Sequence, residues 1–341
     1  MNKSIPQDIA SAISERRKNY TQKAIRGQFG ETMVALATTH PNFLVLTSDL
    51  MYATGIDSFG ALHPERLINL GIAEQNMTGV AAGLALCGKL PIVCGYAAFT
   101  TLRAVEQAKL DAAYNNVKVI FTAQSAGLSY GVGGPTHQTY EDIAIMRAIP
   151  NMIVLVPSDA IEMDSCLHAA LEIETSSPIY IRLGRGPEYN FNSSDVPFQI
   201  GKSTQLRDGK DISILANGSM VFEAILASDF LAGCGIGARV LNLHTVKPID
   251  RDAVRAAAIG VEAMLVIEEH SVIGGLGGAV LECLAEGPAI RVRRIGIEDC
   301  FPPIGPTPEL RMSLGLSAEN LVVNAFDLLG QTIGKPPEDI N

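Results

Sequence analysis

The sequence predicts an α/β protein of two three-layer domains, each built on a mostly parallel sheet. From about residue 43 onward, short β-branched runs alternate with Ala-rich helical stretches, and a Gly-, Pro- and Asn-rich stretch at residues 184–201 interrupts that alternation once. The length of 341 residues also favours two domains over one. A hydrophobic content of 47% supplies enough apolar side chains to cover both faces of two sheets.

The first predicted domain alternates strands with helices as a parallel sheet requires. Its predicted strands are residues 44–47, 67–70, 92–94, 117–122, 153–156 and 179–182. Its predicted helices are residues 74–87, 102–114, 140–148 and 160–171. This order predicts helices on both faces of the sheet.

The same alternation resumes after the interruption. The predicted strands are residues 212–216, 239–243, 263–267 and 290–294, and the predicted helices are residues 220–232, 251–258 and 276–285. We therefore divide the chain into a polar N-terminal arm (residues 1–25), a first domain (26–190), a linker (191–204), a second domain (205–330) and a tail (331–341).

Composition and charge exclude several classes of function. A net charge of −10 repels phosphate backbones, so no nucleic-acid partner is expected, and a phosphorylated substrate would need locally placed arginines. The six cysteines form no CxxC pair, which is typical of reduced thiols in a cytoplasmic protein. The chain shows no signal peptide and no apolar run of about 20 residues, so no membrane association is expected.

Two segments beyond predicted strand ends carry candidate catalytic residues, because ligands of open parallel sheets bind outside the carboxyl ends of the strands. Glu74 lies in the first turn of a predicted helix, where the helix dipole favours a carboxylate whatever its function. His137 ends the sequence Gly-Val-Gly-Gly-Pro-Thr-His at residues 131–137. It is either a proton carrier beside a ligand or the hydrogen-bonded end of a tight turn.

A Gly-rich segment in the second domain resembles a dinucleotide-binding loop. Glu-Glu-His-Ser at residues 268–271 is followed by Gly-Gly-Leu-Gly-Gly at residues 274–278. The segment lacks the GxGxxG spacing and a later acidic residue, so we expect no dinucleotide there.

Several motifs together resemble transketolases and deoxyxylulose-phosphate synthases. In order they are Gly-Ile-Ala-Glu-Gln-Asn-Met at 71–77, Tyr-Ala-Ala-Phe at 96–99, Gly-Pro-Thr-His-Gln at 134–138, Ala-Ile-Pro-Asn-Met at 148–152 and Asn-Leu-His-Thr-Val-Lys-Pro-Ile-Asp at 242–250. The resemblance covers nearly the whole chain. It implies a thiamin-diphosphate-binding pyrimidine domain followed by a transketolase C-terminal domain.

The sequence lacks one segment that this family uses to bind its cofactor, and this absence implies a partner subunit. Members of this family bind the diphosphate and Mg²⁺ through a Gly-Asp-Gly segment followed by Asn, and this chain has no Gly-Asp-Gly. The resemblance therefore implies a split transketolase. An N-terminal partner subunit would carry that motif and hold Mg²⁺, this chain would hold no metal, and two copies of it would form the core of an α₂β₂ assembly. A charged content of only 18% agrees with surface buried in subunit contacts.

The resemblance also assigns residues to the cofactor. Glu74 would hydrogen-bond N1′ of the aminopyrimidine ring and thereby activate the cofactor. Phe99 would stack on that ring, unless it is simply a core side chain. Ile72 and Leu102 would line the same place, and Leu102 replaces a second aromatic residue found in many transketolases.

Other residues would bind a sugar phosphate. His137 would assist proton transfer at sugar hydroxyls. Arg26 and Arg185 would hold the phosphate, with Arg182 as a nearby competitor and structural ion pairs as the alternative for each arginine.

Gly133 is a departure from the pattern, because many transketolases have Asp there to bind a sugar hydroxyl. The histidine expected near Gln124 or Ser125 is also absent. We therefore predict two-carbon ketol transfer between sugar phosphates with an unusual, branched substrate such as apulose phosphate.

Three other interpretations stay open. The β subunit of a 2-oxoacid dehydrogenase E1 component has a similar length and also lacks the metal motif, but it usually carries a different His-containing loop. A deoxyxylulose-phosphate synthase-like enzyme shares most of the motifs. A non-catalytic scaffold subunit would not need Glu74, Phe99 and His137 together.

Overall fold

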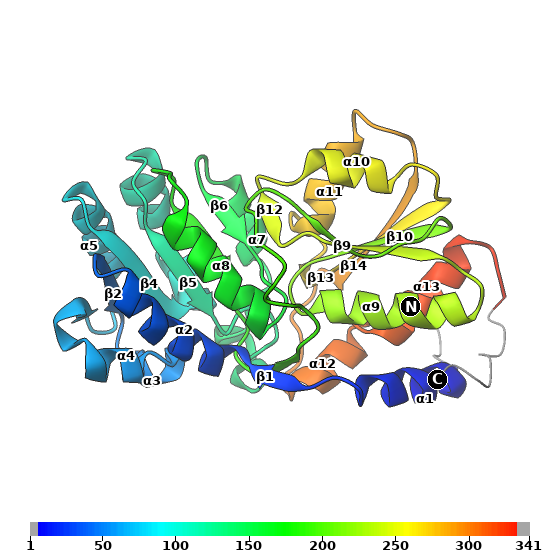
Figure 1. The fold of residues 1–341 in the computed structure, drawn as a ribbon, viewed down its shortest axis with the longest axis horizontal. Helices are drawn as coiled ribbons and strands as arrows, with labels where there is room; N and C mark the ends of the chain where they lie inside the picture. The colour runs from blue at the N-terminus through cyan, green and yellow to red at the C-terminus, as the bar shows by residue number, and fades with distance from the viewer. Residues whose placement is uncertain (1–5, 333–341) are drawn as a thin grey trace.

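The computed structural model describes residues 6–332 and confirms two α/β domains, which lie side by side (Figure 1). The first five residues of the predicted arm and residues 333–341 of the predicted tail lie outside the described residues.

The first sheet has seven strands in the order β12-β6-β7-β5-β4-β2-β3. Their bounds are β2 Phe43–Thr47, β3 Leu67–Asn69, β4 Leu90–Tyr96, β5 Ile120–Gln124, β6 Ile153–Leu155, β7 Ile179–Arg182 and β12 Thr245–Lys247. Six of them are parallel. The edge strand β12 comes from the second half of the chain and pairs antiparallel with β6, so this sheet ties the two domains together.

Helices cover both faces of the first sheet. They are α2 Ile25–Thr39, α3 Met51–Thr54, α4 Asp57–Leu62, η1 Pro64–Arg66, α5 Glu74–Leu86, η2 Ala98–Arg103, α6 Val105–Gln107, η3 Ala108–Tyr114, η4 Gly131–Thr136, α7 Asp142–Ala148 and α8 Ala160–Glu172. The predicted continuous helix at 102–114 was wrong in detail. The helical segment begins at Ala98, and both η2 and η3 are π-helical, a local widening that is frequent at functional sites.

The second sheet has five strands in the order β14-β13-β10-β11-β9. The strands are β9 Thr204–Arg207, β10 Ile212–Ala216, β11 Ala238–Asn242, β13 Ala263–Ser271 and β14 Arg291–Ile297, and the helices are α9 Met220–Gly233, α10 Arg251–Ala257, α11 Leu276–Leu284, α12 Thr307–Ser313 and α13 Ala318–Leu328. Only β9 is antiparallel, at one edge.

The N-terminal arm is more structured than its polar sequence predicted. Its helix α1 (Gln7–Arg17) lies along the second domain, at the far end of the molecule from α5 (Figure 1). Ile9 and Ile13, one helical turn apart, are buried in the core of that domain. Strand β1 (Gln22–Ala24) then pairs with β8 (Pro187–Tyr189) before the chain enters α2. The arm therefore contacts both domains and stabilises their packing against each other.

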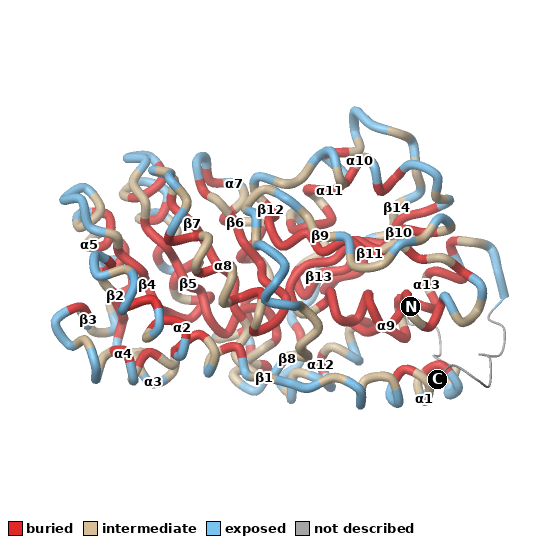
Figure 2. The backbone as a smooth tube through the Cα atoms, in the orientation of Figure 1, coloured by how far each residue is buried: buried red, intermediate tan, exposed pale blue. Residues whose placement is uncertain are grey.

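The apolar core runs through both domains (Figure 2). One buried cluster joins the face of the first sheet under α5 and α7 to the face of the second sheet under α10 and α11. Separate clusters lie under α2 and α8 and under α9 and α13. A continuous core of this kind holds the loops between the domains in fixed positions.

Candidate active site

Three segments meet at the carboxyl edge of the first sheet, where parallel sheets bind ligands. Helix α5 begins just after β3, the π-helical turn η2 follows β4, and the Gly-rich turn η4 follows β5. The predicted residues Glu74, Phe99 and His137 lie one on each segment, or directly after it.

Glu74 is the first residue of α5 and is only 4% exposed. Its Oε1 accepts a hydrogen bond from Nη1 of Arg103 at 3.2 Å. No other side-chain partner of Glu74 is seen within residues 6–332. A buried carboxylate with one partially exposed partner retains acceptor capacity for a ligand.

Phe99 is half-buried on η2 and presents its ring to two neighbours. The Arg103 guanidinium carbon lies 4.1 Å from the ring centroid, and the His137 ring lies edge-on at 5.4 Å. Phe99 and Arg103 are four residues apart on one helical turn, which brings their side chains to the same face. Whether Phe99 stacks on the cofactor ring stays a prediction.

An aromatic cluster of Tyr96, Phe99, Tyr130 and His137 extends from this point. Neighbouring ring centroids lie 5.2–6.0 Å apart. Arg185 reaches the far side of the cluster, where Nη1 donates to the Tyr96 hydroxyl at 2.9 Å and the guanidinium lies 4.2 Å from the Tyr130 ring. No carboxylate partner of Arg185 is found in the described part of the chain, so its charge is available to an anion.

The Gly-rich turn fixes His137. Gly134 has φ +66°, a conformation that glycine adopts without strain. A Cβ added at Gly133 would lie 2.8 Å from Cβ of His137 and 3.1 Å from the Tyr130 ring. His137 Nδ1 lies 2.9 Å from the hydroxyl of Thr136, which leaves Nε2 for another partner. Gly133 is therefore part of the wall that sets the position of His137.

Arg26 is not part of the aromatic cluster. The segment that carries it is hydrogen-bonded to the segment that carries Arg185. Arg26 is the second residue of α2 and follows Ile25, whose amide donates to Gly186 O at 3.1 Å. Its guanidinium has no ion-pair partner within residues 6–332, and its side chain lines an open groove with Tyr52, Gly55 and other residues of α2–α4. Ile72 and Leu102 are 77% and 45% exposed, so neither is held in a ligand-ready pocket by this chain alone.

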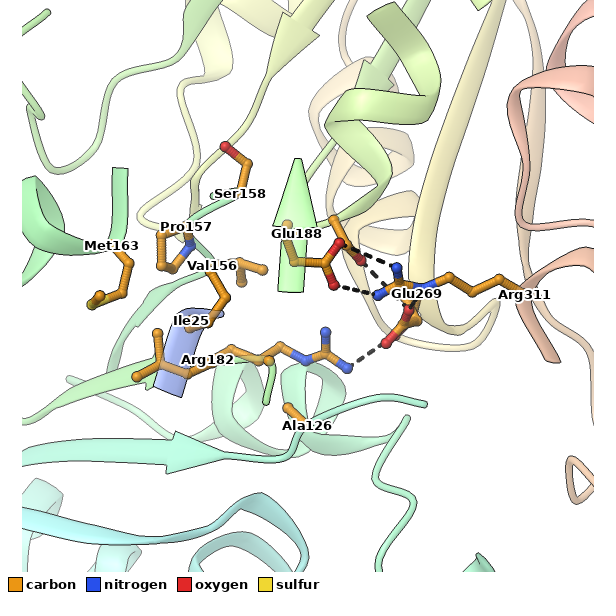
Figure 3. Close-up of a pocket in the computed structure, with 14 residues that line it drawn as sticks. Ile25, Ala126, Val156, Pro157, Ser158, Met163, Arg182, Glu188, Glu269 and Arg311 are labelled. Atoms are coloured by element: carbon orange, nitrogen blue, oxygen red, sulfur yellow. Dashed lines mark hydrogen bonds and ion pairs between the residues drawn. The ribbon is translucent and has the colours of Figure 1, made fainter. Parts of the chain in front are cut away.

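Arg182 does not compete with Arg185 for a substrate. It is buried, and its Nε donates to Asp142 Oδ2 at 2.8 Å. It belongs to a buried ion cluster at the junction of the domains, defined by Asp142, Arg182, Glu188, Glu269 and Arg311. Figure 3 shows the last four of these residues. Every member pairs within the cluster, and the cavity there, about 20 Å³, has room for roughly one water molecule. The cluster therefore joins the domains rather than binding a ligand.

The Gly-rich segment of the second domain already holds a carboxylate. Glu268 accepts hydrogen bonds from Leu276 N at 2.6 Å and Gly277 N at 2.8 Å, at the start of α11. The helix N-terminus that would bind a dinucleotide phosphate is thus occupied by the protein's own side chain.

Sequence reasoning missed Tyr96, Tyr130 and Arg103. Tyr96 is the last residue of β4, a strand-end position that the sheet topology marks. Tyr130 lies six residues beyond the end of β5, directly before the Gly-rich turn. The signal for Arg103 was its spacing of four residues from Phe99 on a helix.

Within residues 6–332, no helix is long and apolar enough to cross a bilayer. No group of three or more His, Cys, Asp or Glu side chains there is placed to hold a metal ion.

Comparison with known families agrees with this fold and site. The transketolase pyrimidine-binding domain matches residues 21–188, and the transketolase C-terminal domain matches residues 201–321. The fold and the edge site together therefore define a protein of the thiamin-diphosphate-dependent transketolase class.

Individual relatives narrow this class. The chain is 40% identical over 304 residues to the 6-deoxy-6-sulfo-D-fructose transketolase subunit of Clostridium sp. (strain MSTE9), covering 89% of this chain and 94% of the relative. It is 37% identical to a subunit of the apulose-4-phosphate transketolase of Phocaeicola vulgatus, covering 90% and 97%. A solved split-gene transketolase, described as an inactive β4 tetramer, superposes with a TM-score of 0.83 at 39% identity, covering 91% and 99%. The chain belongs to the transketolase family, as the C-terminal subunit of a split transketolase.

Proposed function

We propose that this chain is the pyrimidine-side subunit of a two-chain transketolase that transfers a two-carbon ketol unit between sugar phosphates. The observation that carries the proposal is the contiguous series of contacts from Glu74 through Arg103, Phe99 and His137 to Arg185 at one sheet edge.

The residues at the edge fit one half of a thiamin-diphosphate site. When bound, the cofactor supplies the electron sink that such chemistry needs. Glu74 would share its carboxyl proton with N1′ of the aminopyrimidine, and its burial restricts it to one position. Phe99 would support the ring, with Ile72 and Leu102 beside it.

The other residues at this edge of the sheet would bind the substrate. His137 would move a proton at a sugar hydroxyl, since Nδ1 is engaged by Thr136 and Nε2 is left for a ligand. Arg185 and Arg26 would bind the terminal anion, because neither guanidinium is neutralised by a carboxylate within residues 6–332.

The other half of the site is assigned to a partner. This sequence has no Gly-Asp-Gly segment, so the diphosphate and Mg²⁺ would be held by an N-terminal subunit. Exposed apolar side chains near the site, Ile72, Leu102, Leu110 and Tyr114, suit burial in an α₂β₂ assembly. The description of a relative as an inactive β4 tetramer supports a requirement for that subunit.

The substrate proposed is an unusual ketose with a terminal anionic group. Relatives are named for a sulfonated fructose and for apulose 4-phosphate. Gly133 offers no carboxylate to a sugar hydroxyl, which favours an acceptor that differs from the common aldoses.

The test is reconstitution with a chain that carries Gly-Asp-Gly, followed by ketol-transfer assays and calorimetric titration of thiamin diphosphate with Mg²⁺. Glu74→Gln should reduce kcat by roughly 10²- to 10⁴-fold without disrupting assembly. Glu172→Gln, an exposed change at the end of α8, is the matched control and should be neutral. Full activity of Glu74→Gln, or full activity of this chain alone, would refute the proposal.

A further inference from the structure

Arg103 contacts both residues that would receive the aminopyrimidine ring. Its Nη1 donates to Glu74 Oε1 at 3.2 Å, and its guanidinium carbon lies 4.1 Å from the Phe99 ring centroid. The same planar group therefore pairs with the carboxylate and covers the aromatic face at once.

A guanidinium and an aminopyrimidine ring offer similar chemistry to such a pair. Both are flat and delocalised, and both lie well against an aromatic face. The ring protonated at N1′ also resembles the guanidinium in presenting an in-plane N–H to the carboxylate. A carboxylate accepts from either. The two contacts made by Arg103 are thus the two contacts that the cofactor ring requires.

We propose that Arg103 is a self-occluding residue: in the cofactor-free chain its guanidinium takes the place of the aminopyrimidine ring on Glu74 and Phe99, and it must leave both for the cofactor to bind. This inference rests on the function proposed above. It adds a competing internal ligand to the site.

Burial decides which partner moves. The Glu74 side chain is 5% exposed and sits at the rigid start of α5, whereas the Arg103 side chain is 52% exposed. Because half of the Arg103 side chain is exposed, solvent weakens both its ion pair with Glu74 and its cation–π contact with Phe99. Glu106, exposed and three residues further along the same helical segment, offers the released guanidinium another carboxylate.

The arrangement also has a benefit for the cofactor-free chain. A buried carboxylate without a partner is strongly unfavourable. Arg103 neutralises Glu74 until the cofactor arrives, and it keeps the Phe99 face from being exposed to other apolar surfaces.

The experiment measures thiamin diphosphate affinity, with Mg²⁺ present, by calorimetry on the reconstituted complex. Arg103→Ala should bind the cofactor about five- to tenfold more tightly than the unmodified complex, or about 1–1.4 kcal/mol. Arg103→Lys keeps the charge but loses the planar stacking group, so it should gain less. Lys89→Ala changes the net charge equally at the far end of α5 and should leave the affinity unchanged.

A structural readout accompanies the affinity. With cofactor bound, the Arg103 guanidinium should lie beyond about 6 Å from the Phe99 ring, outside cation–π range. Equal or weaker binding by Arg103→Ala, or an Arg103 that stays on Phe99 in the bound complex, would overturn this inference alone. Absence of cofactor binding in every variant, including the unmodified complex, would overturn the proposed function and this inference with it.

Discussion

Arg182 and Arg185 are three residues apart in sequence, yet they lie in two regions that differ in how completely their charges are paired. Arg182 lies in the buried ion cluster between the domains, where it donates to Asp142 and to two backbone carbonyls. Arg185 lies at the edge of the sheet, where it donates to the Tyr96 hydroxyl and lies over the Tyr96 and Tyr130 rings. Arg182 is the last residue of β7, and Arg185 lies beyond the end of that strand.

This difference shows how the pairing of an arginine with carboxylates separates a structural role from a ligand-binding role. In the ion cluster, Arg311 forms two hydrogen bonds with Glu188 and pairs with Glu269, which also accepts from Leu128 N at 2.8 Å. Although burial opposes it, these two carboxylates raise the pKa of Arg311. At the sheet edge, Arg185 lacks a carboxylate within residues 6–332. A fully paired charge stabilises the fold, whereas an incompletely paired one is free to bind a ligand.

The largest expected effect is on stability at the ion cluster. Arg182→Met leaves Asp142 buried without its cation, which should lower the free energy of unfolding by about 3–5 kcal/mol. Arg185→Met should change it by less than about 1 kcal/mol. Urea denaturation of both variants measures the difference, and a similar loss in both would remove the distinction between the two regions.

A second buried acid at the junction should make stability depend on pH. Burial raises the pKa of Glu162 to about 7, against hydrogen bonds from Ser158 and Asn242 that oppose the rise. The folded state therefore binds a proton that the unfolded state has released, and this contribution to stability is lost as pH rises from about 4.5 to 7. Relative to the unmodified chain, Glu162→Gln should gain roughly 2–3 kcal/mol over that interval.

The measurement is the free energy of unfolding against pH, taken for the unmodified chain and for Glu162→Gln and then subtracted. Burial lowers the pKa of nearby His244 to about 4, so His244 lowers the free energy of unfolding as pH falls, in both chains. In the unmodified chain this opposes the pH dependence that Glu162 contributes. Subtracting the two denaturation profiles isolates Glu162. Parallel profiles would show that Glu162 does not titrate in this range.

The two regions also differ in how well the sequence predicted them. Periodicity gave nearly every strand of both sheets, because a buried parallel strand needs a continuous apolar run, and β7 and β10 agree with the prediction residue for residue. The arm helix α1 was missed because only Ile9 and Ile13 mark its buried face. The π-helical start of η2 was missed because no residue type specifies that winding.

At the candidate site, motif order brought Glu74, Phe99 and His137 to one edge, and the structure has them there. The choice between Arg182 and Arg185 was beyond the sequence, because it depends on Asp142, a residue 40 positions away. Arg103 was missed for a similar reason. Its role depends on contacts with Glu74 that no local pattern encodes.

A smaller effect is expected for the aromatic surface at the edge. Phe99→Leu removes the ring but keeps a half-buried apolar side chain, so stability should change little. Aromatic stacking contributes about 0.5–1.5 kcal/mol beyond burial, so thiamin diphosphate should bind roughly 3- to 10-fold more weakly to the reconstituted complex. Calorimetric titration measures this change, and unchanged affinity would assign Phe99 to the core instead.

The smallest expected effect is at Gly133, where geometry and chemistry are separable. A Cβ there meets His137 at 2.8 Å, so both Gly133→Ala and Gly133→Asp should displace His137 and reduce turnover, by less than about 1.5 kcal/mol for an off-rotamer side chain. Only Gly133→Asp adds a carboxylate for a sugar hydroxyl. It alone should shift the ratio of kcat/KM towards xylulose 5-phosphate over apulose 4-phosphate. If Gly133→Ala shifts that ratio equally, or neither variant shifts it, Gly133 controls the position of His137 and not the choice of sugar.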